Sequence, residues 1–210
     1  MVDVNTKVMI AVPCMDMVVA HFCASLYNLK KPCLTRLEML SNSLVYDARN
    51  MLAAKAIDDE SDYVLWLDSD MVFDGDLLER LLEDVQGKDF VSGLYVRRIY
   101  PTTPVIGTKT ITKDGSVRYE ARRDYPRDQM FQVDAIGFGS VITSTKLLKA
   151  CFDKYDRPFN PALGLGEDFI FCHRAKELGF ELWCDSRIKI GHIGRHVFTE
   201  KDYLRQIERE

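Results

Sequence analysis

The chain has 210 residues, of which 47% are hydrophobic and 29% are charged, and its formal net charge is −4. This length and composition suit a domain with a sizeable hydrophobic core, and the mixed charges exclude a polycation that binds nucleic acid or anionic lipid with its whole surface. No apolar run reaches the length of a membrane span, and Asp3 stands where a signal peptide would be basic and then apolar. We therefore expect a cytoplasmic protein with one domain over residues 1–210.

The first half of the sequence predicts strands that alternate with helices. Strands are expected at 7–12, 34–39, 63–67 and 90–95, and helices at 18–29, 44–57 and 77–85. Ser43 stands where its side chain can cap the second of these helices. This alternation predicts an α/β fold with a mostly parallel sheet and right-handed crossovers between consecutive strands.

The second half has a more mixed pattern. A hairpin is expected from strands at 108–112 and 117–119 around the turn at 113–116. A strand over 131–141 is interrupted by Gly137 and Gly139, and glycine inside a strand often marks a close approach by a ligand. Helices are expected at 145–151, capped by Ser144, and at 167–178 and 201–207, with short strands at 182–184 and 188–190. The chain thus divides into a nucleotide-binding half of about 1–100 and a second half of about 101–210.

Two carboxylates follow the apolar strand at 63–67, which carries the sequence Tyr-Val-Leu-Trp-Leu. Asp68 and Asp70 then project from the carboxyl end of a buried strand, where open α/β sheets place their ligand crevice. Carboxylates at this spacing suit a divalent cation. The alternative is a solvated loop whose aspartates only cap the next helix.

Four sequence motifs, in this order, resemble those of GT-A fold glycosyltransferases. They are Asp68-Ser69-Asp70, Gly137-Phe138-Gly139, Gly166-Glu167-Asp168 and His192. The segment Asp47-Ala48-Arg49-Asn50 is similar to the Ala-Arg-Asn of family 2-like members. The resemblance runs from residue 10 to about residue 196. It implies a GT-A type fold, with a Rossmann-like, mostly parallel central sheet, helices on both faces and a mixed C-terminal half. It also implies transfer of a sugar from a nucleotide diphosphate sugar to an acceptor hydroxyl.

The resemblance implies a metal and a base as well. Asp70 would bind Mn²⁺ (or Mg²⁺), Asp68 would contact the ribose or help to hold the metal through water, and His192 would be a third ligand. Carboxylate and imidazole ligands together suit Mn²⁺ better than Ca²⁺. Asp168, or its neighbour Glu167, would be the catalytic base. Read singly, His192 suits an ordinary surface histidine and the two acids a charged first helical turn.

Five residues of the first half are candidates for binding the donor nucleotide, in addition to Asp68. They are Pro13, Glu38, Ser43, Arg49 and Asn50. Pro13 ends the first strand where a base would rest on the backbone, and the others lie on or near elements that face the same crevice. Arg49 can bind a diphosphate through a charge-assisted fork, or it can be an exposed helical arginine.

The segment from residue 97 to residue 127 carries eight basic residues against three acidic ones, a net charge of +5. Such a run is a solvated face or the binding site of an anionic acceptor. The second reading assigns the acceptor to Arg97, Arg122 and Arg123, beside Gly137 and Gly139. The acceptor is then a carbohydrate such as an acidic polysaccharide, a phosphorylated lipid carrier or a nucleic acid. Because the chain is compact, an oligomer or a partner chain is expected to complete the acceptor site.

Two other functions fit part of the sequence. The Asp68-Ser69-Asp70 strand end also resembles the first motif of haloacid dehalogenase-type phosphatases, in which the first aspartate is a nucleophile. That motif is normally near the start of a chain and needs a later lysine that has no clear counterpart here. A sugar or nucleotide binding module without catalysis is the other alternative.

Overall fold

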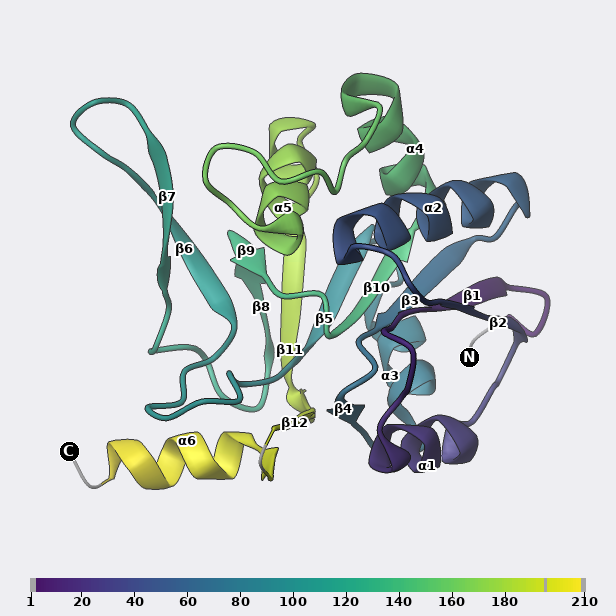
Figure 1. Ribbon diagram of the computed structural model, residues 1–210, viewed down its shortest axis with the longest axis horizontal. Coiled ribbons are helices and arrows are strands. Elements are labelled where there is room, and N and C mark those ends of the chain that lie inside the picture. Colours follow the sequence, from purple (N-terminus) through teal and green to yellow (C-terminus); the bar gives the residue numbers. More distant parts are fainter. Residues whose placement is uncertain (1–2, 195, 209–210) are drawn as a thin grey trace.

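A seven-stranded sheet forms the centre of the protein (Figure 1). We describe a computed structural model over residues 3–194 and 196–208. The strand order is β2 (Leu34–Leu40), β1 (Lys7–Pro13), β3 (Tyr63–Leu67), β10 (Ser140–Ser144), β5 (Phe90–Leu94), β11 (Leu182–Lys189) and β8 (Met130–Val133). All except β10 and β8 run in one direction. The predicted α/β fold with a mostly parallel sheet is therefore confirmed.

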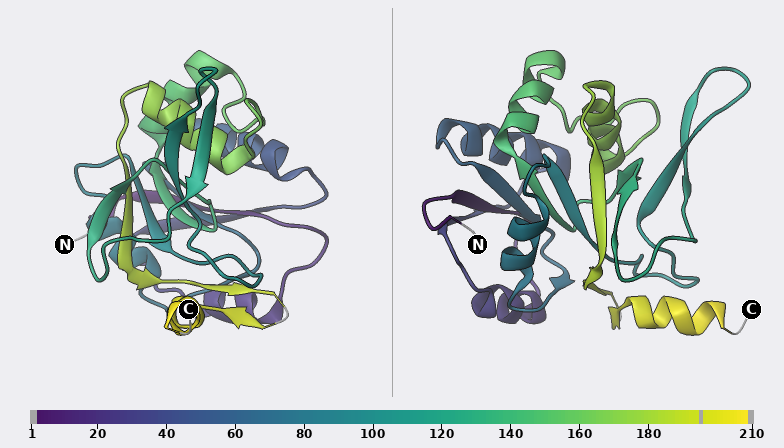
Figure 2. Two further views of the ribbon diagram at one scale, coloured as in Figure 1. Left: turned by 90° about the vertical axis from the view of Figure 1, so that its left-hand side faces the viewer. Right: turned by 180° about the vertical axis from the view of Figure 1, so that it is seen from behind.

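Helices cover both faces of this sheet (Figures 1 and 2). One face carries α2 (Val45–Asp58), α4 (Thr145–Tyr155) and α5 (Glu167–Glu177), and the other carries α1 (Ala20–Asn28) and α3 (Leu77–Asp84). The side chains of β1 alternate between the two cores. Met9 and Ala11 pack with α2, whereas Val8, Ile10 and Val12 pack with α1 and α3. This burial on both faces explains why the strand reads as a continuous apolar run.

The predicted strand over 131–141 is wrong, because the chain there forms three strands in two sheets. They are β8, β9 (Ala135–Ile136) and β10. Gly137 and Gly139 lie where the chain changes sheets, and a Cβ on either residue would overlap the side chain of Tyr95. The two glycines thus permit a close approach of protein to protein.

Strand β10 also changes the order of the sheet. It runs antiparallel between β3 and β5, so these two parallel strands are not neighbours, as consecutive crossovers would have made them. The Trp66 indole N–H donates to Thr143 Oγ1 of β10 at 2.9 Å, which satisfies the one polar atom of this buried ring. A strand from the second half of the chain therefore supports the strand that leads to Asp68 and Asp70.

Two smaller sheets and one helix complete the structure. One sheet joins β4 (Met71–Val72), β12 (Gly191–Ile193) and β13 (Val197–Phe198), and α6 (Glu200–Ile207) follows it. The other joins β9 to the confirmed hairpin of β6 (Ile106–Ile111) and β7 (Val117–Ala121), which projects from the body of the protein (Figure 2). The two short strands expected at 182–184 and 188–190 are one strand, β11, with an irregular register against β5.

The two predicted helix caps have different outcomes. Ser144 caps α4, because the backbone N–H of Leu147 donates to its Oγ at 3.1 Å. Ser43 does not cap α2, since Leu44 is the N-cap residue and no side chain accepts a hydrogen bond there. The Ser43 hydroxyl instead donates to the Leu44 carbonyl oxygen at 3.4 Å.

Candidate functional site

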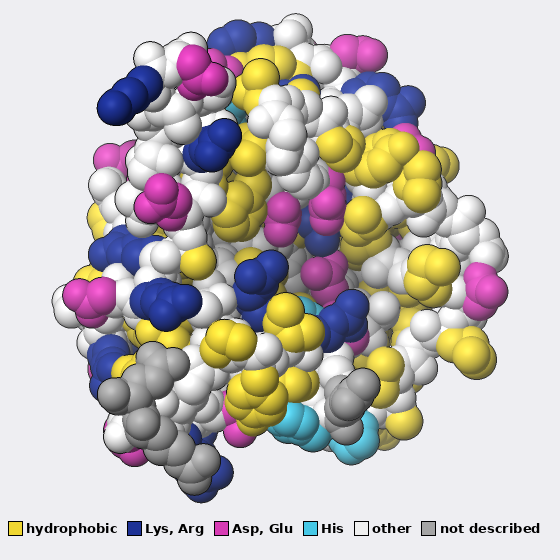
Figure 3. Space-filling model, turned by 60° about the vertical axis from the view of Figure 1, so that its left-hand side comes forward, with side chains coloured by type: hydrophobic (Ala, Val, Ile, Leu, Met, Phe, Trp, Pro, Cys, Tyr) yellow, Lys and Arg dark blue, Asp and Glu magenta, His cyan; other side chains and the backbone are white. Residues whose placement is uncertain are grey.

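A cavity of about 450 Å³ opens at the carboxyl ends of β1 and β3. Figure 3 looks onto this hollow, with acidic side chains inside it and basic and hydrophobic side chains around it. Its lining comes from both halves of the chain. The lining residues are Pro13, Cys14, Met15, Ser43, Val45, Arg49, Asp68, Ser69, Asp70, Tyr95, Arg97, Arg98, Ile99, Val105, Glu167, Asp168 and His192.

The pairing of β4 with β12 brings Asp70 and His192 together from distant parts of the chain. His192 lies opposite Met71 in the antiparallel register, and the Ile193 N–H donates to the Asp70 carbonyl oxygen at 2.8 Å. The His192 Nε2 atom is 3.5 Å from Asp70 Oδ2. On its other side the ring bonds through Nδ1 to the Val96 carbonyl oxygen at 2.9 Å.

These contacts leave His192 ready to act as a ligand. A carbonyl oxygen only accepts hydrogen bonds, so Nδ1 carries the proton and the neutral ring has its lone pair on Nε2, toward Asp70. Metal-binding histidines usually have their other ring nitrogen fixed in this way. Burial alone would raise the pKa of Asp70, but the hydrogen bond and positive charge of the His192 ring in its protonated form, together with the charge of Arg98, outweigh burial and lower the pKa, so this carboxylate is ionised near neutral pH.

Arg98 is the second partner of Asp70. Its Nη1 donates to Asp70 Oδ2, and its side chain is 53% exposed. The loop that carries it is closed by a hydrogen bond from the Arg97 N–H to the Thr103 carbonyl oxygen at 2.9 Å. Gln206 of α6 holds the same end of the loop, since its Oε1 accepts from the Thr102 N–H at 2.7 Å. The base of this loop is therefore held by two contacts, while the Arg98 side chain lies in the cavity wall.

Asp68 forms a different kind of ion pair, with Arg49 of α2. The Arg49 side chain is only 2% exposed, and its Nη2 lies 2.7 Å from Asp68 Oδ1 and 3.9 Å from Glu167 Oε1. Its guanidinium carbon lies 5.0 Å from the centre of the Phe138 ring. Burial lowers the pKa of Arg49, but the neighbouring carboxylates more than offset it, so Arg49 is a permanent buried cation. Its Nε and Nη1 have no hydrogen-bond partner within residues 3–194 and 196–208.

Glu167 and Asp168 occupy the first turn of α5, after Gly166 as the N-cap residue. Asp168 Oδ1 accepts from the Phe169 N–H at 2.7 Å. Burial, with the negative charge of Glu167, raises the pKa of Asp168 to about 6. A carboxylate with this pKa can take up a proton near neutral pH more readily than an ordinary aspartate.

Tyr95 is a cavity residue that the sequence analysis did not assign to the site. Its hydroxyl oxygen accepts from the Gly139 N–H at 3.1 Å, and its ring meets that of His192 edge to face, with the ring centres 5.5 Å apart. Burial holds the pKa of Tyr95 well above its usual value, so the hydroxyl keeps its proton. Gly137 and Gly139 do not line the cavity and instead make room for this ring. A tyrosine at a strand end gives no sign in the sequence that distinguishes it from a core residue.

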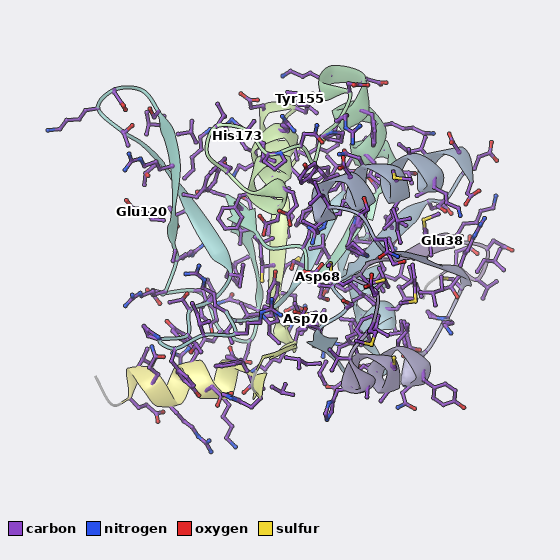
Figure 4. The ribbon with its side chains drawn as sticks, in the orientation of Figure 1. Glu38, Asp68, Asp70, Glu120, Tyr155 and His173 are labelled. Atoms are coloured by element: carbon purple, nitrogen blue, oxygen red, sulfur yellow. The ribbon has the colours of Figure 1, made fainter. Side chains whose placement is uncertain are left out.

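The residues predicted to bind the donor are only partly gathered here. Pro13, Ser43, Arg49 and Asp68 line the cavity. Glu38 lies apart on β2, as Figure 4 shows, and accepts from Lys55 Nζ at 2.7 Å. Asn50 donates to Asn160 Oδ1 at 2.9 Å and accepts from the Phe159 N–H at 3.1 Å. It therefore fixes the loop that leads into Glu167.

The basic segment does not form one surface. Arg97 lines the cavity, but Arg122 lies over the Phe131 ring at 5.2 Å and donates to the Asp124 carbonyl oxygen at 2.9 Å. Arg123 is exposed and does not line the cavity. The reason is the β6–β7 hairpin, which carries the middle of the segment away from the site (Figure 1). The sequence also could not indicate that Arg98, next to Arg97, is the arginine that reaches Asp70.

Of the three predicted metal ligands, the structure joins Asp70 and His192 but leaves Asp68 on Arg49. Within the part of the chain that the structure describes, no three histidine, cysteine, aspartate or glutamate side chains gather as a metal cluster. Over the same ranges, 3–194 and 196–208, no helix is both long and apolar enough to cross a membrane.

Comparisons with known proteins place the chain among recognised folds. The family described as Glycosyl transferase family 2 matches residues 21–146. The crystal structure of A197 from STIV is similar, with a TM-score of 0.58 and 19% identity over 93% of each chain. So is that of GalNAc-T7 with UDP, GalNAc and Mn²⁺, with a TM-score of 0.63 and 12% identity. The latter match covers 98% of this chain but 48% of GalNAc-T7. At such identities these likenesses show the GT-A fold alone. No curated protein sequence matches the chain.

Proposed function

The chain belongs to glycosyl transferase family 2, and on this premise we propose that its cavity transfers a sugar from a nucleoside diphosphate sugar to an acceptor hydroxyl with a divalent cation. One observation carries the proposal. Asp70 Oδ2 and His192 Nε2 meet at 3.5 Å inside the same cavity that Asp168 lines. A pair of ligands and a carboxylate base thus share one crevice at the carboxyl ends of parallel strands, where such folds bind nucleotides.

The residues around Asp70 fit a divalent cation such as Mn²⁺. The Asp70 carboxylate and the proton-free Nε2 of His192 are oxygen and nitrogen donors of the kind that this ion accepts. A bound cation would neutralise the charge that develops on the leaving diphosphate. The presence of Mn²⁺ beside UDP in GalNAc-T7, a protein of the same fold, supports this part of the proposal.

The donor would lie across the ends of β1 and β3. Pro13, Ser43, Arg97 and Arg98 all line the cavity. We assign Pro13 and Ser43 to the nucleoside and the two arginines to the diphosphate. Asp68 is held by Arg49, so its second oxygen is available to a ribose hydroxyl. Arg49 is 2% exposed, with its Nη2 on Asp68 and 3.9 Å from Glu167, so we assign it to positioning these two carboxylates and not to binding the phosphates.

Asp168 would act as the base. The acceptor hydroxyl oxygen attacks the anomeric carbon, the bond from this carbon to the diphosphate oxygen breaks, and the hydroxyl proton passes to the Asp168 carboxylate. The raised pKa of Asp168, about 6, keeps it mostly ionised at pH 7 while making it a better proton acceptor than an ordinary aspartate. Glu167 is 3.9 Å from the Arg49 cation and is the less available of the two acids.

The acceptor would enter past Arg97. This residue is exposed on the cavity wall, next to the exposed side chain of Ile99, so the entrance combines a positive charge with apolar surface. We propose an acceptor with an anionic group, such as a phosphorylated lipid carrier or an acidic carbohydrate. Arg122 and Arg123 do not line the cavity, so we assign them only to the outer part of the path by which the acceptor reaches it.

Family membership favours this reading over the phosphatase and the non-catalytic binding module. A donor hydrolysis assay separates the three. We expect the protein with Mn²⁺ to release nucleoside diphosphate from one member of a panel of nucleotide sugars, and to release no phosphate from a phosphate monoester. Release of phosphate would support the phosphatase, and binding without release would support the binding module. The exposed Asp153→Asn variant is the matched control for Asp168→Asn, which should lose the activity.

A further inference from the structure

Two side chains lie next to the same oxygen atom of Asp70. Arg98 Nη1 and His192 Nε2 both face Oδ2, the first as a hydrogen-bond donor and the second at 3.5 Å with its lone pair. A cation held by Oδ2 and Nε2 would therefore compete with the Arg98 guanidinium for the same position beside Oδ2. Because both carry positive charge, they would also repel each other across a short distance.

The structure allows Arg98 to leave this position by moving its side chain alone. Its backbone is packed against Gly194, where an added Cβ would come within 3.2 Å of the Arg98 carbonyl oxygen. The loop base is tied by the Arg97–Thr103 hydrogen bond and by Gln206, which accepts from the adjacent Thr102 N–H. The side chain itself is 53% exposed, in contrast to the 2% of Arg49. A half-exposed arginine on a fixed backbone can change rotamer without disturbing the core.

We propose, on the basis of the function proposed above, that Arg98 is an exchangeable countercharge that pairs with Asp70 until a divalent cation takes Oδ2, and that it then binds the diphosphate of the donor. Arginine suits this second role, because its planar fork binds phosphate oxygens in a bidentate manner. Arg98 thus offsets the charge of Asp70 in one state and that of the diphosphate in the other.

The exchange has a thermodynamic consequence. A cation that binds alone must displace Arg98 from Asp70 and leave it without a carboxylate. A cation that binds with the diphosphate displaces an arginine that gains a new anionic partner. The cation and the diphosphate therefore each increase the affinity of the protein for the other, by more than the direct contact between the two ligands would account for. This coupling is reciprocal.

The test is calorimetry of Mn²⁺ alone, and of UDP and GDP at saturating Mn²⁺, with wild type and Arg98→Gln. We expect Arg98→Gln to bind Mn²⁺ alone about tenfold more tightly and the diphosphate about tenfold more weakly, the size of one charge-assisted hydrogen bond. Arg98→Lys keeps the charge but not the fork. It should bind Mn²⁺ much as wild type does and still lose affinity for the diphosphate. The control is Arg36→Gln, an arginine that is 54% exposed and pairs with Glu38 and Asp59, neither of which lines the cavity.

Each outcome decides one part of the proposal. Equal or weaker Mn²⁺ binding by Arg98→Gln would overturn the competition for Oδ2. Unchanged diphosphate affinity in both Arg98 variants would overturn the second role. A failure of the proposed function would give a different result. Wild type would then bind neither UDP nor GDP, while the affinity for Mn²⁺ alone would still differ between wild type and Arg98→Gln.

Discussion

The two aspartates of the site are two residues apart, yet their arginines differ in kind. Arg49 comes from a helix, is 2% exposed and touches Asp68 at 2.7 Å over the face of Phe138. Arg98 comes from a loop, is 53% exposed and touches Asp70 from the solvent side. The same pair of residue types therefore gives a fixed framework at one position and an exchangeable contact at the other.

Solvent exposure explains this difference. Once an arginine is buried, breaking its ion pair leaves an unsolvated charge, so separating Arg49 from Asp68 is costly. An exposed pair is solvated when it separates and contributes little to stability. A site that must hold a nucleoside in one place and exchange ions in another can use one pair of each kind.

The largest effect is expected at the exchangeable pair. Asp70→Ala should abolish Mn²⁺-dependent binding of nucleoside diphosphate and leave the fold intact, because it removes Oδ2, whose partners are a half-exposed arginine and a partly buried histidine that keeps its hydrogen bond to Val96. His192→Ala should weaken binding less, since Asp70 and the diphosphate would still hold the ion. Calorimetry measures both, and unchanged binding by Asp70→Ala would remove this residue from the metal site.

The next largest effect is expected for Asp168, the acid near the Arg49–Asp68 pair, on the rate of transfer. Asp168→Asn should lower transfer by about 10² to 10⁴-fold with little change in donor affinity, as expected for a lost general base. In wild type the rate should fall as pH drops below about 6, because burial and the negative charge of Glu167 raise the pKa of Asp168 to about 6 and the base is protonated below that pH.

Steady-state kinetics and a pH profile test this prediction about Asp168. Glu167→Gln is the matched control. If that change lowers the rate more, the roles of the two acids are exchanged, and if Asp168→Asn loses donor binding and rate together, Asp168 is a structural residue.

The buried Arg49–Asp68 pair should contribute to the free energy of unfolding. Arg49→Met should lower the free energy of unfolding by about 3 kcal/mol, because it leaves the Asp68 carboxylate without its buried partner. Arg36→Met, which breaks the surface ion pairs of a half-exposed arginine with Glu38 and Asp59, should change it by less than about 1 kcal/mol. Urea denaturation measures both, and equal effects would mean that exposure does not distinguish the pairs.

The smallest effect concerns the acceptor. Arg97→Gln should raise the acceptor KM about threefold to tenfold, as expected for the loss of one partly exposed charged hydrogen bond. The double change of Arg122 and Arg123 to glutamate should raise the acceptor KM less and weaken its salt dependence, because these residues lie outside the cavity lining. Equal or larger effects of the double change would move the acceptor path toward the β6–β7 hairpin.

The sequence predicts the parts of the site that follow from local pattern. Asp68 and Asp70 are found because they end an apolar strand, and Glu167 and Asp168 because they begin a helix. His192 is placed beside Asp70 by β4 and β12, two short strands 120 residues apart, and only a family resemblance points to it. Its role as a ligand stays a prediction.

What the sequence misses depends on long-range packing. Nothing local shows that β10 inserts between β3 and β5, or that Gly137 and Gly139 face Tyr95 rather than a ligand. In the same way, Glu38 and Asn50 have side chains that could contact a nucleotide. In the structure, however, Glu38 forms an ion pair with Lys55, and Asn50 forms a hydrogen bond with Asn160 of the neighbouring loop.

The position of the metal is the central claim, and proton NMR of the histidine rings tests it most directly. The chain has four histidines, at positions 21, 173, 192 and 196. With UDP or GDP present, small additions of Mn²⁺ should broaden the His192 ring signals first, while those of exposed His21 on α1 stay sharp. The His192→Ala variant assigns the signal. A sharp His192 signal under conditions where Mn²⁺ promotes nucleotide binding would contradict the proposed site.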